Sequence, residues 1–357
     1  MIKYISFDAN ANLAGGGTPA FHRRKDLRNR SMEGIQSEIA QFERVWGLAL
    51  PESFINLYHQ EETPEIDDCH FETLEDVNAG SLRWKGMLPH YIPFADDADG
   101  NVFGFYRSES SDKTYILQYQ EDGGGYIPIS SGGRLFLERQ KLMEIYNTQD
   151  EDNIESAPHN ERELHEQLLT VDPLSPDVLL YIGASHLADR KYDTARKLFQ
   201  RAVESTPWFA DPHGLMALMN QIRGNESIAV ESWINAVERP IFLSSSLVNY
   251  YHAGLKIPEM EMIEWASERL LTQTVVEIGP IVKSVASCLF NTKARIELAA
   301  ELRKLNHIAG EERELLNALA VAVDDSEINT AYDTLIEFYE RVGNRTMHQR
   351  CIEDKNL

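Results

Sequence analysis

With 357 residues the chain is long enough for two domains, and its 43% apolar and 25% charged residues are typical of soluble globular proteins. The formal net charge of −23 repels phosphate groups, which makes nucleic acid and anionic membranes poor partners and would attract a basic protein. No run approaches the roughly 18 apolar residues that a membrane span needs, and the N-terminus has no signal-peptide layout.

Cysteine and histidine give no sign of a disulfide framework or of a metal site. The three cysteines are odd in number and far apart, and the eleven histidines show no ligand spacing. We therefore expect a cytoplasmic protein that needs no metal and no cofactor. The sequence leaves the oligomeric state open.

Residues 1–30 are predicted to form an N-terminal arm. A short strand-like piece from Ile2 to Phe7 leads into a triple glycine at residues 15–17 and then into the basic stretch HRRKDLRNR. The triple glycine lacks the Gly-Lys-Ser/Thr that completes a phosphate-binding loop, so no nucleotide site is expected there. A flexible or loosely docked arm is typical of such a terminus.

Residues 31–60 are predicted to form two helices. In the first, Ser31 can cap the N-terminus, and Gly47 suits the position just past the end. In the second, Pro51 fits the first turn. The residues predicted to face the core lie at helical spacing and are Ile35, Ile39, Phe42, Val45, Trp46, Phe54, Leu57 and Tyr58.

An α+β arrangement is predicted up to residue 146. The stretches NVFGFYR and TYILQYQ are short, aromatic and β-branched, which is typical of strands. The glycines of EDGGGY tolerate the positive φ angles of a hairpin turn that leads into YIPIS. Residues 134–146 return to helical spacing, so we expect helices that flank an antiparallel sheet.

The polar and acidic residues 147–160 predict a boundary between an α+β domain at 31–150 and a helical domain at 158–357. Because each side carries its own apolar periodicity, we expect the two halves to have separate cores and to fold separately. Amphipathic helices are also predicted at 257–275, 292–323 and 326–342.

A 34-residue repeat runs through part of the second half. Shifting residues 176–207 by 34 positions aligns Gly183 with Ala217, Ala195 with Ala229, Phe199 with Trp233 and Ala202 with Ala236. This pattern resembles the tetratricopeptide repeat, in which small residues lie where two helices touch and an aromatic residue fills the space between them. The resemblance implies an all-α helical-repeat domain.

Two motifs follow one another in the first half. Phe42-Glu43 precedes the spacing Gly-x-x-Leu-Pro-x-x-Phe, and a later loop reads Pro-Phe-Ala-x-Asp-x-x-Gly. Together they resemble the SUKH superfamily of bacterial immunity proteins, over about residues 31–146. The matching positions are Phe42, Glu43, Gly47, Leu50, Pro51, Phe54, Tyr58, Ile92, Pro93, Phe94, Ala95, Asp97, Gly100, Asn101 and Phe103. The resemblance implies a SUKH-like antiparallel sheet with flanking helices.

Three carboxylates, Asp96, Asp97 and Asp99, are concentrated in that loop. An EF-hand calcium site would place its first and twelfth positions at Ala95 and Tyr106, and neither is a ligand. Acid–base hydrolysis would need carboxylates in different environments and a supporting motif, and neither is visible. A polar turn and an acidic surface for a basic protein both stay open, with Asp97 predicted to be the structural residue.

The SUKH resemblance implies a non-enzymatic immunity protein, or antitoxin, that neutralises a cognate bacterial toxin by occlusion, for example a basic nuclease. The alternative is an adaptor or regulator whose repeats dock a cellular protein, and an enzyme is not expected. The predicted partner-binding residues are acidic groups with aromatic anchors: Asp96, Asp99, Glu121, Asp122, Glu61, Glu62, Trp84 and Tyr119. Asp67 and Asp68 extend the same acidic surface.

Overall fold

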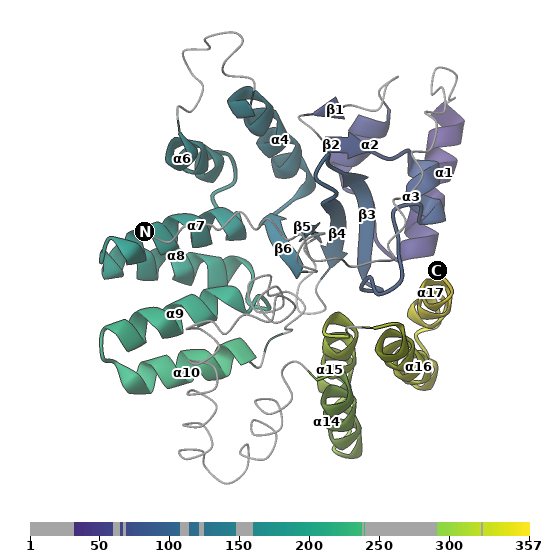
Figure 1. The fold of residues 1–357 in the computed structure, drawn as a ribbon. Helices are drawn as coiled ribbons and strands as arrows, with labels where there is room; N and C mark the ends of the chain where they lie inside the picture. Colours follow the sequence, from purple (N-terminus) through teal and green to yellow (C-terminus); the bar gives the residue numbers. More distant parts are fainter. Residues whose placement is uncertain are drawn as a thin grey trace.

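Figure 1 shows the computed structural model of the protein, in which a mixed α/β part lies beside a set of packed helices. The structure describes residues 32–59, 65–66, 69–107, 114–120, 125–147, 160–237, 239, 291–322 and 324–357. The predicted N-terminal arm, the cap at Ser31 and the helix expected at 257–275 lie outside these residues. Six strands form one sheet, and helices pack on both of its faces.

The sheet is an antiparallel meander in which each strand pairs with the next one along the chain. Its strands are β1 (Glu65–Ile66), β2 (Cys69–Phe71), β3 (Tyr91–Asp96), β4 (Val102–Arg107), β5 (Thr114–Gln120) and β6 (Gly125–Ser130). The two predicted strands are β4 and β5, and β5 pairs with β6 as the predicted hairpin. Because the strands alternate in direction, the joined ends of β1–β2, β3–β4 and β5–β6 lie at one end of the sheet.

Four helices cover the first face of the sheet: α1 (Met32–Trp46), α2 (Glu52–Tyr58), α3 (Leu74–Ala79) and α4 (Gly133–Asn147). They bury a phenylalanine cluster around Phe54, whose ring centroid lies 4.7 Å from those of Phe94 and Phe105. Gly47 ends α1 at a φ of +64°, which confirms the predicted stop. Pro51, however, precedes α2 as its N-cap and does not lie in its first turn.

The rest of the described chain is helical. Its helices are α6 (Glu161–Val171), α7 (Pro176–Ala188), α8 (Tyr192–Ser205), α9 (Asp211–Ile222), α10 (Glu226–Val237), α14 (Thr292–Lys304), α15 (Ile308–Ala320), α16 (Asp325–Val342) and α17 (Arg345–Lys355). The single helix expected at 292–323 is in fact α14 and α15, because Asn306 adopts a φ of +57° and turns the chain between them.

The 34-residue register is visible in the packing of these helices. The second helices of the two repeats, α8 and α10, begin 34 residues apart. A Cβ on Gly183 would fall 2.4 Å from the ring of Phe199, and Ala195 and Ala229 have no exposed surface. Small residues therefore lie where paired helices touch, as the repeat requires. The predicted fold class, a SUKH-like α+β sheet followed by an all-α helical-repeat region, is confirmed.

The second face of the sheet is covered by the C-terminal helices and by the residues before α9. Strand tyrosines, among them Tyr91, Tyr115 and Tyr126, lie in one buried cluster with Trp208 and with apolar side chains of α15, α16 and α17. We call this the shared cluster. The expectation of a separate core for each half was therefore wrong, because apolar periodicity does not reveal which face of a sheet a distant helix covers. The division at 147–160 stays a prediction about the chain.

Arg83 connects this packing to the last helix of the chain. Its Nε donates to Oδ1 of Asp354 at 2.8 Å and its Nη2 to Oδ2 at 2.6 Å, and both side chains are almost fully buried. The same guanidinium donates to the carbonyl oxygens of Leu88 and Tyr91. Arg350, also on α17, lies over the ring of Trp46 with its guanidinium 4.0 Å from the ring centroid.

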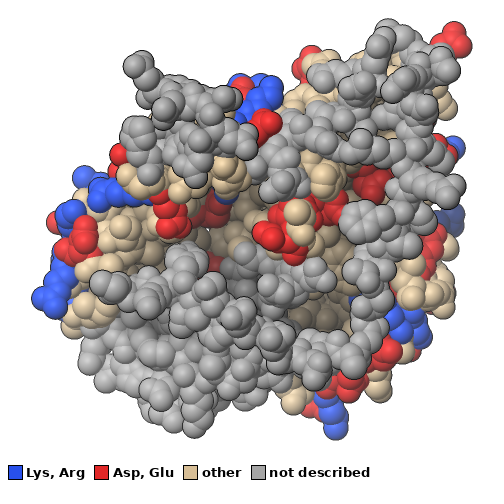
Figure 2. All heavy atoms as spheres, turned by 45° about the horizontal axis from the view of Figure 1, so that its top comes forward, with Lys and Arg blue, Asp and Glu red and all other residues tan. Residues whose placement is uncertain are grey.

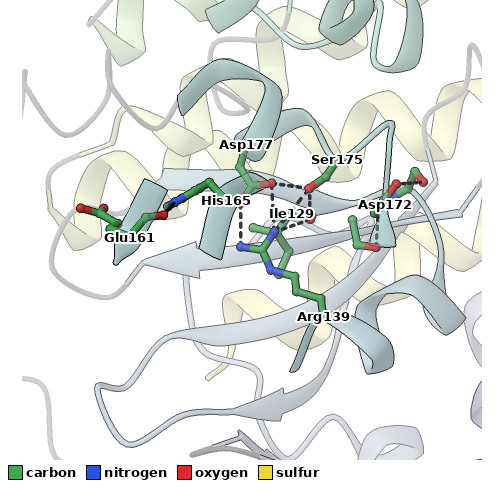
Figure 3. Close-up of polar contacts among 9 residues, drawn as sticks. Ile129, Arg139, Glu161, His165, Asp172, Ser175 and Asp177 are labelled. Atoms are coloured by element: carbon green, nitrogen blue, oxygen red, sulfur yellow. Dashed lines mark hydrogen bonds and ion pairs between the residues drawn. The ribbon is translucent and has the colours of Figure 1, made fainter. Parts of the chain in front are cut away.

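A second polar junction joins α4 and β6 to α7, as Figure 3 shows. Arg139 on α4 pairs with Asp177 at 2.7 Å, and the Ser175 hydroxyl donates to the Ile129 carbonyl at 2.9 Å. Asp172 accepts from the backbone N–H of Ser131 at 2.9 Å. These contacts satisfy polar groups along β6, the outermost strand on that side, and cover an edge that would otherwise be open to another chain.

We expect Asp354→Asn to lower the free energy of unfolding by about 3 kcal/mol, because it leaves the Arg83 guanidinium buried without a counter-charge. Urea denaturation of the full chain measures the change. The control is Glu353→Gln on the same helix, where the half-exposed carboxylate contacts Arg350 at 3.2 Å and Gln349 at 3.1 Å, and it should change stability by less than about 1 kcal/mol. Equal losses in both variants would contradict a buried pair that holds α17.

Candidate protein-binding site

Asp97 holds the turn between β3 and β4. Its Oδ1 accepts from the backbone N–H groups of Asp99 at 3.1 Å and Asn101 at 2.8 Å, and its Oδ2 accepts from the Asn101 side chain at 2.9 Å. Gly100 adopts a φ of +81° and donates to the Asp97 carbonyl. The contacts fit the structural role that turn chemistry predicted for Asp97.

Asp96 and Asp99 have different surroundings. Asp99 is exposed, and among the described residues its carboxylate has no hydrogen bond or ion pair. Asp96 ends β3, is half-buried, and pairs in register with His70 on β2 and Val102 on β4. Burial raises the pKa of Asp96, and the nearby His70 opposes that rise. One residue therefore presents a solvated charge, and the other a partly desolvated one.

Glu72 is a further carboxyl group at this end of the sheet, and the sequence analysis missed it. It follows β2, and its backbone N–H donates to the Phe94 carbonyl at 2.9 Å. Burial first, and then the charges of Asp76 and Asp96, raise the pKa of Glu72 to about 7. Thr73 caps α3, and its hydroxyl donates to the Asp76 carboxylate at 2.5 Å. The Thr-x-x-Asp spacing is the sequence signal that predicts the start of a helix directly after Glu72.

The two predicted aromatic anchors pack against each other. The ring centroids of Trp84 and Tyr119 lie 4.7 Å apart, and both side chains are partly buried against the shared cluster. Tyr119 pairs in register with Val102, which itself pairs with Asp96. The two rings therefore lie at the same end of the sheet as the acidic turn, with much of their surface already engaged in the core.

Four carboxyl groups lie at one end of the sheet, and we call this region the acidic end. They belong to Glu72, Asp96, Asp97 and Asp99. The other predicted contact residues, Glu61, Glu62, Glu121 and Asp122, lie outside the described residues, as do Asp67 and Asp68. The flanking strand ends are described, and Ile66 and Gln120 both lie at the acidic end. Figure 2 looks from the side of β1 and β2, and acidic side chains gather near the middle of that face.

Two negative findings concern the part of the chain that the structure describes. No group of three or more His, Cys, Asp and Glu side chains there is arranged to hold a metal ion. Within the same residues, no helix combines the length and the apolar character that crossing a membrane requires.

The fold is an α+β domain with an antiparallel sheet, followed by a helical-repeat region. Residues 36–139 match the model of the SMI1 / KNR4 family (SUKH-1), which confirms the resemblance seen in the motifs of the first half. This is a family known for immunity proteins. The match includes the whole acidic end and stops before the helical region.

Similarity to solved structures is weak. The crystal structure of PilW, a widely conserved type IV pilus biogenesis factor, matches with 14% sequence identity and a TM-score of 0.25. The match covers 62% of this chain and 91% of that one. A likeness of this size carries no argument about function. No curated protein matches the chain.

We expect Asp97→Ala to lower the free energy of unfolding by about 1–2 kcal/mol, because the N–H groups of Asp99 and Asn101 lose their acceptor. Asp99→Ala, two positions away, removes the same charge from an exposed site and should cost less than about 0.5 kcal/mol. Thermal and urea melts of the two variants decide between them. Equal destabilisation would mean that the turn does not depend on the Asp97 contacts.

We expect Glu72 to make the protein less stable as the pH rises. Its pKa is raised from 4.5 in the unfolded chain to about 7 in the folded one, so the folded state binds the proton more tightly. The stabilisation is fully present below pH 4.5 and is lost as the pH rises through about 7. Because Glu72 is only half-buried, solvent screening reduces the effect to about 1 kcal/mol.

Melting temperatures from about pH 5 to pH 8 test this dependence. Glu72→Gln should flatten the fall in stability, because its side chain cannot ionise beside Asp76 and Asp96. Glu75→Gln, on the exposed side of α3, serves as the control and should follow the unmodified protein. A Glu72→Gln profile that runs parallel to the unmodified protein at every pH would assign the dependence to another group.

Proposed function

We propose that this protein is a non-enzymatic immunity protein that binds a basic toxin domain at the acidic end of its sheet and neutralises it by occlusion. The SUKH-1 match of residues 36–139 supports the class. The net charge of −23 supports a basic partner, because such a surface draws cationic proteins and repels nucleic acid.

One observation carries the choice of surface. The meander brings the joined ends of β1–β2, β3–β4 and β5–β6 to the same end of the sheet. Each of these three connections is acidic in sequence, with Asp67 and Asp68 in the first, Asp97 and Asp99 in the second, and Glu121 and Asp122 in the third. The described strand ends beside these connections therefore lie at one end of the sheet, together with Asp96, Asp97 and Asp99.

The mechanism follows from the charges. Lysine and arginine side chains that hold substrate phosphates in a nuclease would meet Asp96, Asp99 and the acidic connections instead, and the bound protein would block access to the catalytic groups. A cation near Glu72 would favour its ionised form, so complex formation would release a proton near neutral pH. Asp97 stays committed to the turn, and Trp84 and Tyr119 add apolar contact at the border of the surface.

The alternative function is that of an adaptor in which the helical pairs α7–α8 and α9–α10 dock a cellular protein. The exposed cations Arg190, Arg196 and Lys197 in and after the α7–α8 connection favour it as an additional role. An enzyme that uses the aspartate cluster is not proposed, because the three carboxylates do not share one desolvated site: Asp99 is solvated and Asp97 is engaged by the turn amides.

The test is the association of the full chain with a basic toxin domain, sought first among the products of the genes beside its own. We expect the double variant Asp96→Asn with Asp99→Asn to associate about 3- to 10-fold more slowly at low salt and to melt within about 2 °C of the unmodified protein. The difference should shrink as salt is raised, because screening shortens the reach of the charges to ~8 Å near physiological ionic strength.

The control removes the same formal charge elsewhere. It is the double variant Glu297→Gln with Glu301→Gln on α14, where the two glutamate side chains are 69% and 63% exposed. If this pair slows association as much as the aspartate pair does, only net charge matters and the acidic end is not the site. Toxin activity that persists at saturating concentrations of the protein would overturn the immunity function itself.

A further inference from the structure

A basic edge lies on the helical repeats, away from the acidic end. The connections α7–α8 and α9–α10 lie side by side, because the Arg223 guanidinium sits 5.6 Å from the centroid of the Tyr192 ring and 4.0 Å from the Asp193 carboxylate. In Figure 2, lysine and arginine side chains appear at the left-hand border with acidic side chains between them, on the side where α7–α10 lie in Figure 1. We define this basic edge by Arg190, Arg196, Lys197 and Arg223.

Three of these cations are not used inside the molecule. Arg190, Arg196 and Lys197 are exposed, and within the described residues none of them has an ion pair or a side-chain hydrogen bond. On a chain whose formal net charge is −23, three uncompensated cations within eight residues, in the α7–α8 connection and the first turns of α8, are a local reversal of sign. Solubility does not explain them, because additional acidic residues would serve that purpose as well.

The backbone conformation of Arg190 is the second observation. The four helix-to-helix connections after residues 186, 220, 302 and 339 share one hydrogen bond, in which a backbone N–H donates to the carbonyl five residues earlier. Each contains one residue with a positive φ, and these residues are Arg190, Gly224, Asn306 and Gly343. Glycine and asparagine adopt this left-handed conformation readily, whereas arginine carries a Cβ penalty there.

The next repeat has a glycine at the position of Arg190. Arg190 and Gly224 are 34 residues apart and therefore occupy the same position of the repeat, with φ angles of +60° and +75°. The fold thus accepts glycine at this position but holds an arginine in the first repeat against its backbone preference. Strain of this kind at a surface residue indicates that the side chain itself is needed.

Exposed aliphatic side chains complete the edge. Ile222 and Ile228, on either side of the α9–α10 connection, are 56% and 50% exposed. Apolar surface next to unpaired cations matches a partner that offers carboxylates together with aliphatic or aromatic side chains. We propose that the basic edge docks an acidic, partly apolar segment of a protein partner. This surface has the opposite charge to the acidic end and goes beyond the proposed toxin site.

The probe is a fluorescein-labelled peptide of Glu, Asp and Leu, compared with a peptide in which Gln and Asn replace the acids. Fluorescence anisotropy with the full chain should show at least 10-fold tighter binding of the acidic peptide at low salt. Arg190→Gly should weaken that binding about 5-fold and at the same time raise the melting temperature by about 1–3 °C, because glycine relieves the backbone penalty.

A lower affinity together with a higher melting temperature in Arg190→Gly would show that the Arg190 side chain serves binding and not stability. Lys197→Gln should also weaken binding, without the rise in melting temperature. Lys293→Gln on α14, a side chain that is 87% exposed, removes a cation elsewhere and should change neither quantity. The double variant Asp96→Asn with Asp99→Asn should bind the peptide normally, so that failure here is distinguishable from failure of the proposed toxin site.

Three results would overturn the proposal. The first is equal binding of the acidic and the neutral peptide. The second is an Arg190→Gly variant that keeps full affinity. The third is tighter binding of transfer RNA or of phosphatidylserine vesicles than of the acidic peptide, with the same sensitivity to Arg190→Gly, since this would make the edge a phosphate site.

Discussion

Arg83 lies where the last helix of the chain meets the sheet, and its guanidinium makes two contacts with Asp354 and two with backbone carbonyl oxygens. A buried ion pair by itself seldom stabilises a protein, because removing two charges from water costs about as much as their attraction returns. The additional carbonyl acceptors satisfy the guanidinium and limit the positions that α17 can take. The pair therefore acts mainly to specify how the C-terminal helices sit on the sheet, while the shared cluster supplies the apolar burial.

With both faces of the sheet covered, a partner can reach only the ends of the strands, the outer helix faces and the connections. Within the described residues, the acidic end and the basic edge lie on such surfaces and have opposite signs. The acidic end belongs to the SUKH-like half and the basic edge to the repeats. If both proposed surfaces bind, a basic and an acidic protein would be held at the same time, because the two surfaces share no residue.

The parts of the structure that depend on local signals could be predicted from the sequence. Helical spacing placed α1 and α4, turn chemistry identified Asp97, and the 34-residue register located the contact of Gly183 with Phe199. What depends on distant pairing could not be predicted. The Tyr332 hydroxyl donates to the Met87 carbonyl across 245 positions, and no periodicity in either segment indicates the other. Glu72 was missed for the same reason, since the pairing of β2 with β3 brings Asp96 close to it. The role of Trp84 and Tyr119 as anchors stays a prediction, and the sequence alone did not reveal how far the core engages them.

The two faces of the sheet also differ in when they can be completed during synthesis. The phenylalanine face is closed by α1 to α4, all of which lie within the first 147 residues. The second face, which carries the tyrosines of the shared cluster, is completed only when α15 to α17 have been synthesised. The last strand, β6, ends at Ser130, and α17 ends at Lys355. At translation rates of 5–20 residues per second, roughly 10 to 45 s pass between these two points. For that interval a row of aromatic side chains faces the solvent on the ribosome, which makes the nascent chain a natural client for chaperones that recognise exposed apolar surface.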